Sequence, residues 1–186
     1  MDLKLQGKIA LVGGSSAGIG RAIARELANE GASVIICARE EQRLNETRDH
    51  MLKEFNCKVL AVPADLSKSR EIDQVVAKGR QELGPIDILV NNTGGPPAGQ
   101  FEDLSPESWE AAVKLLLYSA LNLTRAVLPD MKARGWGRIL NVTSVAVKQP
   151  VDNLMLSNSL RSAVTGFART LANEVAPYGI TVNNIL

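Results

Sequence analysis

The sequence predicts an α/β fold, a doubly wound parallel sheet with helices on both faces in three layers, α/β/α. Two observations predict it. Short runs of Val, Ile and Leu alternate along the 186 residues with longer segments of helical periodicity. Most of these runs are almost continuously apolar, as expected for strands that are buried on both faces of a parallel sheet. Right-handed crossovers between such strands place helices on both sides.

Strands and helices are expected in strict alternation. The strand candidates are residues 8–14, 32–38, 58–65, 86–92, 137–144 and 179–186. The helix candidates lie around residues 18–30, 40–55, 68–83, 105–133 and 157–176. Gly31 is the expected C-terminal cap of the first helix, and Pro177 is expected to end the last one. Nothing in the pattern resembles a linker or a repeat, so we expect a single domain over residues 1–186. Because the last strand runs to Leu186, we expect that domain to be incomplete at its C-terminus.

Composition argues against several classes of function. The 21 Lys and Arg and the 20 Asp and Glu leave a formal net charge of +1 without a charged block, which argues against nucleic-acid or membrane-surface binding. No apolar run reaches the ~18 residues that a membrane span needs, and the N-terminus has no signal-peptide pattern. Cys37 and Cys57, both expected in strands, lack metal-ligand spacing, and His50 is the only histidine. We therefore expect a cytoplasmic protein with reduced thiols and no metal site.

A glycine-rich turn, "GGSSAGIG", follows the first expected strand and opens the first helix. Gly14, Gly18 and Gly20 have the spacing G-x-x-x-G-x-G. Glycines at such a place allow a sharp turn and let a pyrophosphate approach the helix N-terminus, where free N–H groups favour anions. A plain tight turn is the alternative, but the strand–turn–helix context favours a dinucleotide site. The binding residues expected in this turn are Gly14, Ser15, Ser16, Gly18, Ile19 and Gly20.

The end of the second expected strand bears on the choice of dinucleotide. A carboxylate there would bind the ribose 2′-hydroxyl, whereas an arginine suits a 2′-phosphate. The sequence places Arg39 directly after Ala38, and its acids, Glu40 and Glu41, come later at the start of a helix. A solvated loop residue is the alternative for Arg39. Together with Ser15 in the glycine turn, Arg39 favours NADP over NAD.

Two further strand ends carry polar or glycine residues suited to a cofactor. Asp65, followed by Leu66, ends the third expected strand, where a carboxylate can accept from an adenine amino group. Asp65 can equally cap the following helix. Asn91 and Gly94 lie in "NNTGG" after the fourth strand, where amides can join strand ends and glycine lets the backbone face a cofactor. A plain turn is the alternative, but ligands bind at such strand ends in this class of fold.

Taken together, these stretches resemble the short-chain dehydrogenase/reductase family. The motifs that carry the resemblance are, in order, "GGSSAGIG", "ADL", "NNTGG", "NVTS" and "APYGITVNNI". The resemblance covers essentially the whole chain and implies a Rossmann-like sheet, a nicotinamide cofactor and hydride transfer to or from a carbonyl or alcohol carbon. The family's cofactor positions fall on Gly14, Gly18, Gly20, Asp65, Asn91 and Gly94. Gly13 replaces the usual threonine and Thr93 the usual alanine, which we expect binding to tolerate.

The same resemblance implies that the catalytic positions have changed. The family uses a serine, a tyrosine, a lysine four residues after it, and a helix asparagine. Ser144 matches the serine, whereas Ser157 stands at the tyrosine position, Arg161 at the lysine position and Leu116 at the asparagine position. Arg161 is also expected to keep the family lysine's contact with the cofactor ribose or a phosphate.

These exchanges weaken acid catalysis. A phenol titrates near ~10 and a nearby cation can lower that value, whereas an aliphatic hydroxyl is a far weaker acid. An arginine keeps its charge and cannot relay a proton. Tyr118 and Tyr178 are expected to lie away from the site, and Lys148 is the best substitute, with a solvated loop residue as the alternative. For Ser157, a role as helix N-cap is as well supported as a role in the site.

We expect an oxidoreductase that uses NADP, or alternatively NAD, on a small-molecule carbonyl or alcohol, with Ser144, Ser157 and Arg161 as the catalytic residues. The alternatives are a cofactor-binding scaffold or sensor that has lost turnover, and a partner subunit in a hetero-oligomer. The family resemblance further implies a homodimer or homotetramer. Its subunits would pair through the helices around 107–128 and 157–175.

Overall fold

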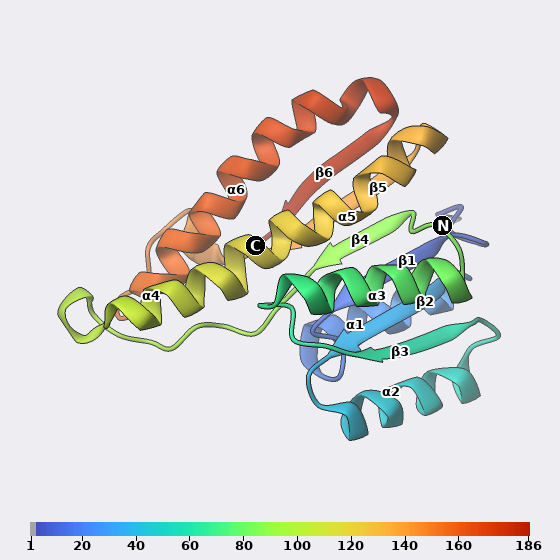
Figure 1. Ribbon diagram of the computed structural model, residues 1–186, viewed down its shortest axis with the longest axis horizontal. Helices are drawn as coiled ribbons and strands as arrows, with labels where there is room; N and C mark the ends of the chain where they lie inside the picture. Colours follow the sequence, from blue (N-terminus) through green and yellow to red (C-terminus); the bar gives the residue numbers. More distant parts are fainter. Residues whose placement is uncertain (1–2) are drawn as a thin grey trace.

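Six parallel strands form one sheet in the order β3-β2-β1-β4-β5-β6 in the computed structural model, which describes residues 3–186 (Figure 1). The strands are β1 Ile9–Gly13, β2 Ser33–Ala38, β3 Val59–Pro63, β4 Ile88–Asn91, β5 Gly137–Val142 and β6 Ile180–Ile185. The direction of strand progression reverses between β1 and β4, which creates the crevice at the carboxyl edge where such sheets bind ligands. The predicted doubly wound, Rossmann-like sheet is confirmed.

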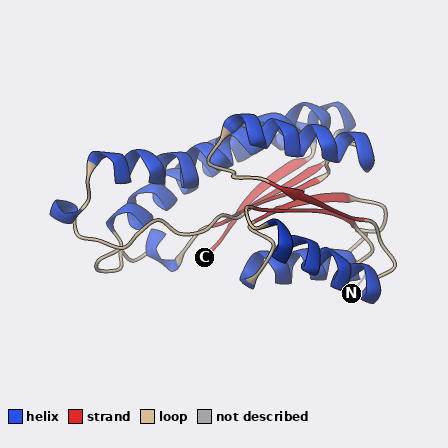
Figure 2. Ribbon diagram, turned by 60° about the horizontal axis from the view of Figure 1, so that its bottom comes forward, coloured by secondary structure: helices blue, strands red, loops and turns tan. Residues whose placement is uncertain are grey.

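Helices cover both faces of this sheet (Figure 2). They are α1 Gly18–Asn29, α2 Glu41–Glu54, α3 Ser69–Glu82, α4 Pro106–Ala112, α5 Ser119–Arg134 and α6 Met155–Val175. The short helices are η1 Phe101–Asp103, η2 Val113–Tyr118, η3 Val145–Val147 and η4 Ala176–Tyr178. Because side chains alternate along a strand, Ala10 and Val12 pack with α1 and α2, whereas Leu11 packs with α3, α5 and the end of α6.

The long helix predicted over 105–133 contains an unpredicted π-helical segment, η2, between α4 and α5. Ser119 Oγ donates to the carbonyl oxygen of Leu115 at 2.5 Å, within this wider turn. One extra residue in the turn changes the direction in which the following side chains point, and such segments are frequent at functional sites. Leu116 is buried, whereas Tyr118 is exposed.

By length and composition, Pro106–Arg134 is also the one candidate membrane span among residues 3–186, with 39% of its most apolar window buried. This differs from the sequence expectation, which considered only uninterrupted apolar runs. One such helix is weak evidence for a span, because a core helix passes the same test. Here Leu123, Val127 and Met131 belong to the core between the helix and the sheet.

Three local predictions were wrong. The last helix begins at Met155 with Leu154 as its N-cap, so Ser157 lies inside the first turn and does not cap the helix. Asp65 does not cap α3, whose N-cap is Lys68, because its carboxylate accepts from the Ser67 amide at 3.0 Å and so forms a turn before the helix. Cys57 lies in the loop before β3 and not in a strand.

The glycine turn is packed so closely that Gly20 has no room for a side chain. A Cβ atom at Gly20 would lie 2.3 Å from the carbonyl oxygen of Gly14 and 2.7 Å from Asn92 Nδ2.

We expect Gly20→Ala to lower the free energy of unfolding by about 1–3 kcal/mol, measured by urea denaturation. Gly166→Ala is the control, because Gly166 is exposed in α6 and has nothing within 4 Å of an added Cβ. There we expect a gain of about 0.5–1 kcal/mol from helix propensity. Equal stability of the Gly20 variant and wild type would contradict the close packing.

Candidate functional site

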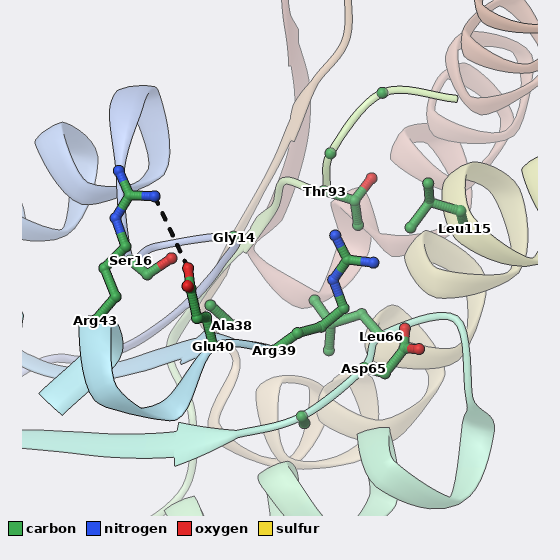
Figure 3. Close-up of a pocket in the computed structure, with 13 residues that line it drawn as sticks. Gly14, Ser16, Ala38, Arg39, Glu40, Arg43, Asp65, Leu66, Thr93 and Leu115 are labelled. Atoms are coloured by element: carbon green, nitrogen blue, oxygen red, sulfur yellow. Dashed lines mark ion pairs between the residues drawn. The ribbon is translucent and has the colours of Figure 1, made fainter. Parts of the chain in front are cut away.

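A cavity of about 330 Å³ opens at the carboxyl edge of the sheet, beside the point where the strand order reverses. Its lining comes from the turns after β1, β2, β3 and β4 and from η2 (Figure 3). The lining residues are Gly14, Ser16, Ala38, Arg39, Glu40, Arg43, Ala64, Asp65, Leu66, Thr93, Gly94, Gly95 and Leu115. The structure thus brings together Gly14, Ser16, Arg39, Asp65, Leu66 and Gly94 from the residues singled out in the sequence.

The glycine turn forms the wall of this cavity at the N-terminus of α1. Gly14 and Gly18 have φ angles of +57° and +54°, in the left-handed region that favours glycine. Asn92 Nδ2 donates to the carbonyl oxygens of Gly13 at 3.0 Å and Gly14 at 3.4 Å, which ties the turn to the end of β4. A Cβ at Gly18 would meet nothing within 4 Å, and the first turn of α1 has no acidic residue. The free N–H groups of α1 are therefore open to an anion.

The side chain of Ser15 does not line the cavity. It is completely buried. Its hydroxyl donates to the carbonyl oxygen of Val12 at 2.9 Å and accepts from the amide of Cys37 at 2.8 Å. Ser15 therefore joins the end of β1 to β2.

Burial, and secondarily the charges of Glu71 and Asp65, raise the pKa of the Cys37 thiol to about 12, so the thiol stays protonated at neutral pH.

Two arginines line the cavity together with the carboxylates of Glu40 and Asp65. Arg39 follows β2 and is exposed, and Arg43 reaches the cavity from the first turn of α2. Arg43 forms an ion pair with Glu40 at 3.9 Å, with 56% and 70% of the two side chains exposed (Figure 3). The buried Thr47 hydroxyl lies 3.2 Å from the carbonyl oxygen of Ser16 and 3.0 Å from that of Arg43. Thr47 thus holds the start of α2 against the glycine turn.

Asp65 remains ionised at neutral pH. Burial works to raise the pKa of its carboxyl group, but hydrogen bonds from Ser67 and the charges of Lys68 and Arg39 outweigh burial, and the pKa lies below its ordinary value. The Asp65 amide donates to the carboxylate of Glu71 at 2.6 Å, which fixes the turn after β3. A charged acceptor is therefore available at this side of the cavity.

Asn91 does not line the large cavity. Its side-chain amide donates to Asn141 Oδ1 at 2.8 Å, and the amide of Asn141 donates to Asn184 Oδ1 at 3.0 Å. The three residues are paired in register across β4, β5 and β6, so they form a polar ladder through the sheet. Asn91 instead lines a second, small cavity of about 20 Å³ together with Leu116 and Arg161.

Arg161 joins α6 to the end of β5. Its Nε donates to Ser157 Oγ at 3.2 Å, and its Nη1 donates to the carbonyl oxygens of Val142 at 2.9 Å and Thr143 at 3.1 Å. Burial lowers the pKa of the guanidinium group, and none of the ion pairs within residues 3–186 includes Arg161. The site therefore contains a half-buried positive charge bound to neutral acceptors.

Ser144 directly follows the two carbonyl groups that Arg161 binds. It is the N-cap of η3, and its Oγ accepts from the amide of Ala146 at 3.2 Å. Ser144 lines neither of the two cavities.

Lys148, at the end of η3, is exposed, in agreement with a solvated loop residue. Tyr178 is 44% exposed and packs under Lys132, 4.7 Å from the ring centre, so it does not supply a phenol to the site.

Sequence reasoning missed several lining residues of the large cavity. Arg43 stands three residues after Glu40, and this i, i+3 pair of opposite charges at a helix start was a usable signal. Thr93 and Gly95 adjoin the predicted Gly94. Leu115 reaches the cavity from η2, and no sequence pattern indicated that π-helical segment.

Comparison with known proteins identifies the family. Residues 8–186 match the family model for short chain dehydrogenase, and the chain belongs to that family. A putative ketoacyl reductase of Streptomyces coelicolor is 37% identical over 180 residues, which span 96% of this chain and 69% of that protein. L-sorbose reductase of Gluconobacter frateurii, solved in complex with NADPH and L-sorbose, superimposes with a TM-score of 0.96 at 37% identity, over 99% of this chain and 70% of the reductase. An NADPH-bound short chain oxidoreductase of Pseudomonas aeruginosa, described as containing an atypical catalytic center, has a TM-score of 0.92 at 30% identity, over 97% and 71% of the two chains.

The buried position of Ser15 gives a test by stability. In Ser15→Ala the amide of Cys37 loses its acceptor inside the core, and an unsatisfied buried donor costs about 1–3 kcal/mol. We expect that loss in the free energy of unfolding, measured by chemical denaturation. Ser16→Ala is the matched control, because Ser16 faces the cavity, and we expect a change within about 0.5 kcal/mol. If the two variants were equally stable, the hydrogen bonds of Ser15 would not stabilise the junction of β1 and β2.

Proposed function

We propose that this protein is an NADP(H)-dependent oxidoreductase that interconverts a carbonyl compound and an alcohol. The observation that carries the proposal is the cavity at the reversal point of the sheet, with a glycine turn and a free helix N-terminus at one wall. The similarity to two oxidoreductases solved with NADPH supports it. When bound, the nicotinamide ring supplies or accepts the hydride.

The lining residues suit the parts of a dinucleotide. The open N-terminus of α1, from Gly18 through Ile19 and Gly20, would bind the pyrophosphate. The ionised carboxylate of Asp65 would accept from the adenine amino group, with Leu66 beside it. Gly94, which has nothing within 4 Å of an added Cβ, would let the backbone after β4 approach the ring system.

The two arginines that line the cavity support NADP over NAD. Arg39, Arg43 and the hydroxyl of Ser16 all line it, and two guanidinium groups suit a 2′-phosphate. Glu40 is the competing carboxylate, but its exposed pair with Arg43 at 3.9 Å is worth ~1 kcal/mol or less. A phosphate dianion would therefore displace Glu40 from Arg43 at little cost.

We expect Arg43→Gln to raise the Kd for NADPH about tenfold, which corresponds to a loss of about 1.4 kcal/mol of binding free energy. The Kd for NADH should stay unchanged, because NADH has no 2′-phosphate. Both constants are measured by nucleotide fluorescence titration. Arg48→Gln, on the same helix but outside the cavity, is the control and should change neither constant. An equal loss of affinity for both nucleotides, or no loss at all, would contradict a 2′-phosphate contact.

Ser144 is the residue we propose to orient the substrate. Its oxygen accepts from the amide of Ala146, so the hydroxyl hydrogen is available to donate to a substrate carbonyl oxygen. In reduction, the hydride goes to the carbonyl carbon and a proton goes to the oxygen, delivered from Ser144 with resupply from water. The half-buried charge of Arg161 stabilises the negative charge that develops on that oxygen.

We expect Ser144→Ala to lower kcat about 100-fold while leaving the Kd for NADPH unchanged, because the variant removes one donor to the developing oxyanion. NADPH oxidation on a panel of aldehydes and ketones gives kcat, and Ser159→Ala, on the exposed face of α6, is the control. Unchanged turnover in Ser144→Ala would exclude this site.

A second candidate function is a cofactor-binding scaffold or sensor. The observation that favours it is Ser157, an aliphatic hydroxyl at the position where the family has its proton-donating tyrosine. NADPH binding by the wild-type protein without turnover on any substrate of the panel would select the scaffold.

A further inference from the structure

We propose that Ser157 and Arg161 act together as a positioning unit for Ser144 and are not a displaced acid–base pair. This inference rests on the proposed function, and it reassigns two of the three residues expected to be catalytic. The guanidinium group of Arg161 makes its hydrogen bonds with the protein itself.

Arg161 binds the backbone at the end of β5. Its Nη1 donates to the carbonyl oxygens of two consecutive residues, Val142 at 2.9 Å and Thr143 at 3.1 Å. These are the last residue of β5 and the residue after it. The guanidinium group therefore binds the backbone just where the chain leaves the sheet and turns toward Ser144.

The backbone at Thr143 determines the direction of the Ser144 side chain. Thr143 is held from the other side as well, because its amide and hydroxyl both donate to the carbonyl oxygen of Ile185, at 2.8 Å and 2.9 Å. With Thr143 fixed from both sides, Ser144 begins η3, and its oxygen accepts from the amide of Ala146 at 3.2 Å. The direction of the Ser144 hydroxyl is thus coupled to the Arg161 contacts.

Ser157 binds the same guanidinium group. It lies one turn before Arg161 on α6, and its Oγ accepts from Arg161 Nε at 3.2 Å. Two nitrogens of one rigid plane are thereby bound, which fixes the orientation of the guanidinium group. A lysine carries a single nitrogen on a flexible stem, so it cannot satisfy the serine and both carbonyl groups in this planar arrangement. The serine and the arginine are therefore matched to each other.

The test compares Arg161→Lys with Arg169→Lys, the same exchange at an exposed position two turns further along α6. The structural readout is amide hydrogen exchange at Ala146, whose N–H is bound by Ser144 Oγ. We expect exchange at Ala146 to be about tenfold faster in Arg161→Lys and unchanged in Arg169→Lys. Ser157→Ala, a milder variant, should shift it in the same direction. Unchanged exchange in both site variants would overturn the inference.

The kinetic readout is a double-mutant cycle. We expect Arg161→Lys to lower kcat by about 10- to 100-fold without changing the KM for NADPH. In a protein that already carries Ser144→Ala, we expect the same substitution to lower kcat by less than about twofold further. Independent losses from the two substitutions would overturn the positioning role. So would a higher kcat in Arg161→Lys than in wild type. If the wild-type protein neither binds NADPH nor turns over a substrate, the proposed function fails, whereas the exchange experiment still decides the role of Arg161.

Discussion

The contact between the glycine turn and the end of β4 is the constraint on which the site depends. Asn92 donates to the carbonyl oxygens of Gly13 and Gly14, and the absence of a side chain at Gly20 lets α1 approach the same turn. This packing joins β1, α1 and β4 at the point where the strand order reverses. Without it, the N-terminus of α1 would have no fixed direction relative to the cavity.

The carboxyl edge of β5 is organised differently, by side chains that bind backbone. Arg161 holds the carbonyl oxygens of Val142 and Thr143, while an asparagine ladder through Asn141 connects β4, β5 and β6. Ser157 and Arg161, which the family resemblance placed at the tyrosine and lysine positions, bind each other, and Arg161 keeps a fixed positive charge.

The two halves of the site also differ in how tightly they are built. The dinucleotide side has exposed, loosely paired charges in Glu40 and Arg43, which a ligand can rearrange cheaply. At α6 the groups are half-buried, and Arg161 donates three hydrogen bonds, one of them to Ser157. That division suits a protein that exchanges its nucleotide while keeping the reacting groups in place.

The sequence by itself determined the sheet, the order of the elements and the glycine turn. Apolar runs for buried strands and a G-x-x-x-G-x-G spacing are local patterns, so composition along the chain suffices to predict them. Ser144, Ser157 and Arg161 were proposed from the family resemblance, and their catalytic role stays a prediction. Such patterns do not give direction: Ser15 and Asn91 lie at the predicted turns, but their side chains bind partners within the sheet.

Only the tertiary structure decided what each polar side chain contacts. Ser15 binds Cys37 from the neighbouring strand, Arg43 reaches the cavity because Thr47 ties α2 to the glycine turn, and Leu115 reaches it from a π-helical segment without a sequence signal. The physical reason is that hydrogen-bond partners lie across strands and helices that are distant in sequence. A local pattern specifies where a residue stands, but the packing of distant elements determines which way it faces.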